Sequence, residues 1–125
     1  MFKRSLLALT LAAGFLAQPA LADSERPEHY KGLPSETLEE AVKNFSEYNT
    51  KLETVLAAED LDLAKLDEIH QLTYTLENAL GKIKADLDTL SETLEAVHKA
   101  SEHGDAETAR REGAKYLSTS RTLVK

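Results

Sequence analysis

The chain has 125 residues and a formal net charge of −7 at pH 7, from 22 acidic and 15 basic side chains. This length allows one domain, and the acidic balance argues against a nucleic-acid binder, which would carry a basic surface. The sequence has no Cys, which excludes disulfides, thiolate zinc sites, thioether-attached haem and a cysteine nucleophile.

The first 22 residues have the layout of a secretory signal peptide. Lys3 and Arg4 precede an apolar run over residues 6–17, and an Ala-x-Ala motif ends at Ala22. We expect cleavage after Ala22, export to the periplasm and no integral membrane segment in the product. The apolar run is much shorter than the ~20 residues of a membrane-spanning helix, and an uncleaved anchor is the alternative.

Residues 23–34 are expected to form an extended lead rather than a helix, because the segment contains two Pro and one Gly among many charged residues. Disorder of this segment is the alternative, and Tyr30 and Leu33 are the side chains that would attach it to the rest of the chain. The predicted organisation is therefore a signal peptide (residues 1–22), the lead (23–34) and a helical domain (35–125).

A first helix is predicted from Ser35, as its N-cap, to Ala58. Apolar residues there follow steps of three and four, the heptad spacing, with Asn49 in the one vacant position. The apolar positions are Leu38, Val42, Phe45, Leu52 and Leu56, and the row is widened on one side by Ala41, Tyr48 and Val55.

The longest periodic segment predicts one continuous helix over residues 62–103, roughly 60 Å long. Its heptad positions are Leu66, Ile69, Thr73, Leu76, Leu80, Ile83, Leu87, Leu90, Leu94, Val97 and Ser101. A turn would normally break this phase. Gly81 is the one helix breaker within the segment, and a break near Gly81, giving a compact four-helix bundle, is the alternative.

Gly104 and Asp105 predict a turn and a new N-cap, followed by a last helix from Ala106 to Leu123. With no strand pattern, the fold class is all-α: an antiparallel helical bundle with one long central helix and two shorter ones. Two short helices on the halves of a long one would leave apolar seams exposed. We therefore expect a homo-oligomer or a protein partner.

The candidate chemistry centres on His70. Asp67 and Tyr74 share its helix surface, and His29 is a further candidate ligand. Zinc usually takes three or four protein ligands, so solvated histidines near carboxylates are the simpler interpretation. On a continuous helix His70 and His98 are about 42 Å apart, too far to share one haem. We expect no metal, no cofactor and no catalytic residues.

Two resemblances add to this. The segment SERPEHYKG (24–32), followed by a Glu-rich helix and EIHQLTYTLE (68–77), resembles an uncharacterised family of small exported proteobacterial helical proteins, a domain of unknown function. The segment from Leu94 to Thr122 is similar in cadence to the last two helices of soluble periplasmic b-type cytochromes, which are four-helix bundles. The haem-ligating His of that family would fall near Lys125, and its Met ligand has no counterpart.

These observations predict a non-enzymatic exported protein that acts through self-association or partner binding along its leucine-rich seam. A small-ligand or metal-binding bundle centred on His70 is the second hypothesis. An envelope chaperone is the third, since amphipathic helices and an acidic surface are compatible with holding unfolded clients.

Overall fold

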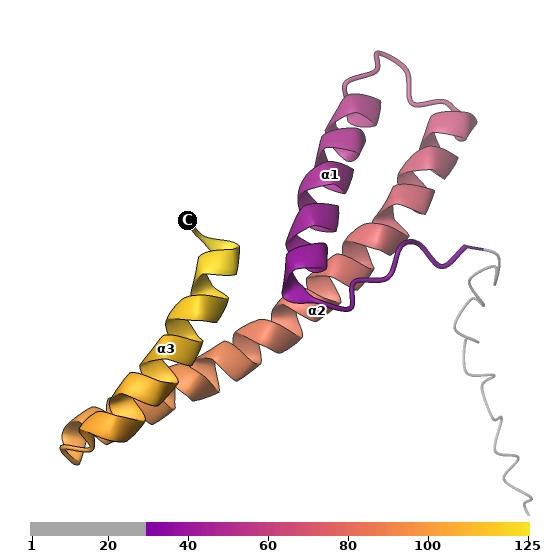
Figure 1. Ribbon diagram of the computed structural model, residues 1–125. Coiled ribbons are helices and arrows are strands. Elements are labelled where there is room, and N and C mark those ends of the chain that lie inside the picture. Colours follow the sequence, from indigo (N-terminus) through magenta and orange to yellow (C-terminus); the bar gives the residue numbers. More distant parts are fainter. Residues whose placement is uncertain (1–29) are drawn as a thin grey trace, which may run out of the picture.

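The computed structural model describes residues 30–125, which form three helices, α1 (Leu38–Leu56), α2 (Leu63–Glu102) and α3 (Ala106–Leu123) (Figure 1). Both α1 and α3 pack antiparallel against α2, one on each half of it. The described residues contain no strand, so the predicted all-α class with one long central helix is confirmed. The predicted signal peptide and His29 lie outside the described residues.

The start of α1 differs from the prediction. Thr37, not Ser35, is the N-cap: its hydroxyl accepts from the backbone N–H of Glu40, and the Glu40 carboxylate accepts in return from the Thr37 N–H. This is a capping box, which satisfies two helix-end donors at once. The Ser35 hydroxyl instead accepts from Asn44 Nδ2 at 3.1 Å, because it lies in the segment that precedes the helix.

The long helix α2 is continuous through Gly81, so the alternative break near Gly81 is wrong. Asp62 is the N-cap and accepts from the backbone N–H of Lys65 at 2.9 Å. At the other end Gly104 has a φ of 68°, and the backbone N–H of Asp105 donates to the Ala100 carbonyl at 2.9 Å. This C-terminal bond and the positive φ of Gly104 form a Schellman motif, which ends α2 at the predicted place.

Replacing Gly81 by Ala is expected to stabilise the chain by about 0.5–1 kcal/mol, because Gly is a poor helix former and restricts the unfolded chain least. A Cβ at Gly81 meets nothing within 4 Å, so no clash opposes the gain. Denaturant unfolding measures the difference. Gly104→Ala is the matched control: it also meets nothing within 4 Å, but its φ of 68° makes the same substitution destabilising. A destabilised Gly81→Ala variant would contradict an unstrained continuous helix.

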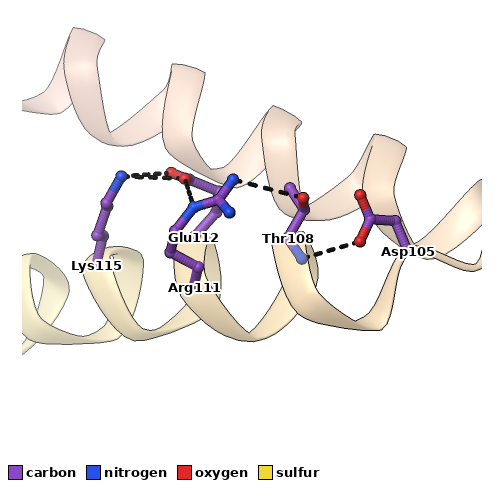
Figure 2. A network of polar contacts seen from close by, with 5 residues as sticks. All are labelled: Asp105, Thr108, Arg111, Glu112 and Lys115. Atoms are coloured by element: carbon purple, nitrogen blue, oxygen red, sulfur yellow. Dashed lines mark hydrogen bonds and ion pairs between the residues drawn. The ribbon is translucent and has the colours of Figure 1, made fainter.

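The beginning of α3 is held by polar contacts along its own surface (Figure 2). Asp105 Oδ1 accepts from the backbone N–H of Thr108 at 3.0 Å, as an N-cap. This hydrogen bond holds the pKa of Asp105 below its ordinary value of 3.8. Further along, Lys115 and Arg111 both donate to Glu112 at 3.0 Å and lower the pKa of that carboxyl. The predicted Asp cap and the predicted helix of residues 106–123 are confirmed.

The core lies between α1 and the first half of α2. Ala41 and Ala79 have no exposed surface, which is a sign of close backbone approach between these helices. The other buried apolar residues of this half are Leu38, Val55, Leu72, Tyr74 and Leu76. By contrast α3 has no buried residue, and beyond Ala79 the described part of α2 buries Ala100 alone. The α2–α3 half is therefore the more open one.

The lengths of the helices explain why the chain does not form a bundle of uniform thickness. At 1.5 Å per residue α2 is about 60 Å long, while α1 and α3 are each about 28 Å. The two short helices therefore cover α2 one after the other, and they approach each other where α1 begins and α3 ends, around Lys43 and Arg121. Most of α2 has one helical neighbour rather than two. Among residues 30–125, no helix has a stretch long and apolar enough to cross a bilayer.

Candidate functional site

Residues 30–37, which precede α1, cross over α2 and are called the clamp below. Figure 1 shows them as the indigo segment that crosses that helix. The backbone N–H of Leu33 donates to Thr75 Oγ1 at 2.9 Å. Asn78 Nδ2 donates to the carbonyls of Lys31 and Leu33, both at 3.0 Å. Side chains of α2 thus satisfy backbone groups of a segment that has no regular structure of its own, and Thr75 is 2% exposed beneath it.

Gly32 is the closest point of this clamp. Its φ is 68°, a conformation that L side chains rarely adopt. A Cβ placed on Gly32 would lie 2.6 Å from the backbone nitrogen of Thr75 and 2.8 Å from the carbonyl carbon of Tyr74. Only a glycine fits here, because the clamp rests directly on the backbone of α2.

An aromatic cluster lies at Tyr30, the first described residue of the clamp. The Tyr30 ring packs on the Tyr74 ring with centroids 5.6 Å apart, and the Tyr30 hydroxyl donates to Gln71 Oε1 at 2.7 Å. Tyr74 also contacts His70: their ring centroids are 5.1 Å apart, and the Tyr74 hydroxyl is hydrogen-bonded to His70 Nε2 at 3.1 Å. These contacts confirm the sequence-based expectation that Tyr30 attaches the lead, whereas Leu33 is attached through its backbone N–H and its side chain is 47% exposed.

The four metal candidates are only partly brought together. His70 and Tyr74 are in contact, but Asp67 Oδ2 accepts from Gln71 Nε2 at 2.7 Å and is not joined to His70. His29 lies outside the described residues. In the part of the chain that the structure describes, no three His, Asp or Glu side chains gather closely enough to hold a metal ion.

The other histidines are held on the surface of their own helix. His98 Nε2 lies 3.2 Å from Glu102 Oε1, and His103 Nδ1 is hydrogen-bonded to the carbonyl of Lys99 at 2.7 Å. Because α2 is continuous, His70 and His98 are about 42 Å apart along the same helix. They cannot ligate the same iron from one chain.

A groove of about 700 Å³ runs beside the clamp, between Tyr30 on one side and Tyr48 of α1 on the other, with α2 as its floor. Lys51 lies at its edge, with its ammonium 4.1 Å from the centroid of the Tyr48 ring, a cation–π contact. The floor contributes Glu68 and Gln71. The lining mixes both charges with aromatic and amide groups, so it does not select a particular ligand chemistry.

The second feature of note is a row of leucines on α2, which we call the leucine stripe: Leu66, Leu80, Leu87 and Leu94. They are 45–49% exposed, although they occupy the heptad positions that the sequence assigns to a packed seam. The alternate heptad row (Ile69, Leu76, Ile83, Leu90 and Val97) is buried or half-buried. The helix therefore packs through one row of its seam and presents the other to solvent.

The buried face of α1 includes more than the predicted row. Ala41 and Val55, which the sequence places beside the main row, are buried together with Leu38 of that row, whereas Leu56 is 51% exposed and Asn49 is exposed as well. The contact face of α1 thus combines the main row with the residues that were expected only to widen it. Heptad spacing alone does not distinguish these faces, because both lie within one apolar stripe.

Sequence reasoning missed Gly32 of the clamp. It also missed the three residues of α2 that bind the clamp, Gln71, Thr75 and Asn78. The last three have a signal in retrospect: they are spaced by four and three residues, as on one helix face, and each can hydrogen-bond to a backbone group or a hydroxyl. A second periodic row, polar and beside the apolar one, is the pattern of a helix that binds an irregular segment.

A model of a protein family matches the whole chain, residues 1–125, and is described as a family of unknown function (DUF6746). No curated protein matches the chain, and neither does any solved structure. The expected resemblance to an uncharacterised family is confirmed by the match.

Proposed function

The chain belongs to the DUF6746 family of unknown function, and we propose that it is an exported, periplasmic, non-enzymatic protein that works by associating with another protein through the leucine stripe of α2. The single observation that carries the proposal is the half-exposure of four leucines that share one side of a helix. Three of them, Leu80, Leu87 and Leu94, follow one another at intervals of seven residues.

Energetics support association at this surface. Fully burying a leucine side chain is worth about 1.5–3 kcal/mol, so covering the exposed half of one is worth about 1 kcal/mol. A row of such side chains therefore favours a partner helix by several kcal/mol before the cost of association is deducted. Intervals of seven residues are the spacing that a second helix can follow along its whole length.

The N-terminal sequence supports the location. Lys3 and Arg4, the apolar run and the Ala-x-Ala motif at residues 20–22 make up the three parts of a secretory signal. Cell fractionation with intact-mass measurement tests this part. We expect a periplasmic species that begins at residue 23, and a full-length cytoplasmic species would contradict it.

The stripe is tested in cells by placing a photo-reactive amino acid at position 87, and separately at position 85 on the opposite side of α2. Both positions are exposed, so neither variant should disturb the fold. We expect illumination to yield a discrete protein adduct from position 87 and none from position 85. Equal adducts from both positions, or none from position 87 in the correctly located chain, would contradict the proposal.

A further inference from the structure

We propose that the protein covering the leucine stripe is a second copy of this chain, with the two α2 helices antiparallel and related by a two-fold axis beside Leu87. The inference rests on the proposed function, association through the stripe, and names its partner and geometry.

Between residues 73 and 101 the leucine side of α2 is symmetric about Leu87, whereas Leu66 has no counterpart because α2 ends at Glu102. Leu80 and Leu94 lie seven residues to either side of Leu87, and the small hydroxyl residues Thr73 and Ser101 lie fourteen residues to either side. In an antiparallel pair with its axis at Leu87, that residue faces its own copy, and Leu80 faces the partner's Leu94. Thr73 faces the partner's Ser101. A surface that matches itself in this way is what a two-fold interface requires.

This register also supplies some of the missing helical neighbours. Counting from the turns, α1 lies level with the first half of its own α2, and α3 lies level with the second half. Reversing the second copy about Leu87 brings the first half of the partner's α3 level with the first half of α1, and the first half of the partner's α1 level with the first half of α3. Over roughly residues 72–81 and 93–102 of α2, each cross-section then contains the two α2 helices, one α1 and one α3. In these two stretches the dimer is a four-helix bundle, although the single chain is not.

The charges of the short helices are complementary in this arrangement. Within its bounds α3 carries four basic and two acidic residues, whereas α1 carries four acidic and two basic ones. Two of the basic residues, Arg110 and Arg121, form no ion pair or hydrogen bond with the residues that the structure describes. The antiparallel register places the first half of this basic helix level with the first half of the acidic α1 of the other copy, which favours the second copy over an acidic partner.

Cysteine cross-linking tests the register, since the natural chain contains no Cys. We expect L87C to form a disulfide-linked dimer of the chain under a mild oxidant, because its two thiols face each other across the axis. L80C alone and L94C alone should stay monomeric on a denaturing gel, whereas an equimolar mixture of the two should cross-link. A85C, exposed on the opposite side of the helix, is the control for random collision. Circular dichroism checks that each variant retains its helices.

The outcomes separate this inference from the proposed function. Self-linking of L80C and L94C without extra product in the mixture would show a parallel pair and overturn the inference. A monomeric mass by light scattering at about 100 μM, with no cross-linking of any variant, would also overturn it. In that case a photo-adduct from position 87 with another protein would still support association through the stripe, whereas failure of both experiments would remove the two proposals together.

Discussion

Gly32→Ala is expected to release the clamp from α2. If the clamp stayed in place, the added Cβ would lie within 3 Å of the α2 backbone at Tyr74 and Thr75, and its φ of 68° would be strained. The left-handed conformation costs about 1–2 kcal/mol and such crowding about 1–3 kcal/mol. The chain avoids this strain by detaching the segment, so the loss of global stability is limited to what the clamp contributes.

Hydrogen exchange measures the release directly, because the Leu33 N–H donates to Thr75 Oγ1 and is protected by that bond. We expect its exchange to accelerate at least about 30-fold, the equivalent of roughly 2 kcal/mol. Lys31→Ala is the matched control. It changes an exposed side chain of the same segment and leaves the carbonyl that accepts from Asn78. Unchanged exchange at Leu33 in the Gly32→Ala variant would contradict a clamp seated on the helix backbone.

Leu76→Ala is expected to lower the free energy of unfolding by about 2–4 kcal/mol. Leu76 is 7% exposed and belongs to the α1–α2 core, so its removal loses burial and leaves a cavity between two helices that are already in close contact. Denaturant unfolding at low protein concentration measures the change. The expected loss is a large fraction of the stability of a domain of this size.

Leu63→Ala is the control for the same substitution on the same helix. Leu63 is 85% exposed at the start of α2, and its loss is expected to change stability by no more than about 0.5 kcal/mol. A Leu76→Ala variant as stable as Leu63→Ala would mean that the α1–α2 contact is not the core of the chain.

The helices could be predicted because their signals are local. Asp105 is the predicted cap, the long helix starts beside residue 62 as expected, Gly104 ends α2, and the heptad phase continues across Gly81 without a slip. The start of α1 was misplaced for an equally local reason. Ser35 is a good cap in isolation, but the pairing of Thr37 with Glu40 satisfies two donors where Ser35 would satisfy one.

Tertiary contacts determine which heptad residues of α2 are buried, and the sequence pattern does not show these contacts. Leu76 and Leu87 are equivalent as heptad residues, yet one is buried and the other half-exposed, because α1 and α3 are too few and too short to cover both rows of α2. The clamp joins residues 41 to 47 positions apart, such as Tyr30 with Gln71 and Lys31 with Asn78. No periodicity within one helix predicts a contact at that separation. The expectation that Tyr30 attaches the lead succeeded because an aromatic side chain in a polar segment needs a surface to cover it.

The continuity of α2 has a consequence for how the chain acquires its structure. Each helix pairs mainly with its neighbour in the sequence, so both hairpins close over short loops, a topology with low contact order that folds fast. Starting a helix is the costly step, whereas extending one adds a hydrogen bond for every residue fixed. Since the buried residues gather in the α1–α2 hairpin, we expect that half to form the folding nucleus and the second half of α2 to grow from it as an extension. The less densely packed end of the molecule thus never has to begin a helix of its own before α3 can dock.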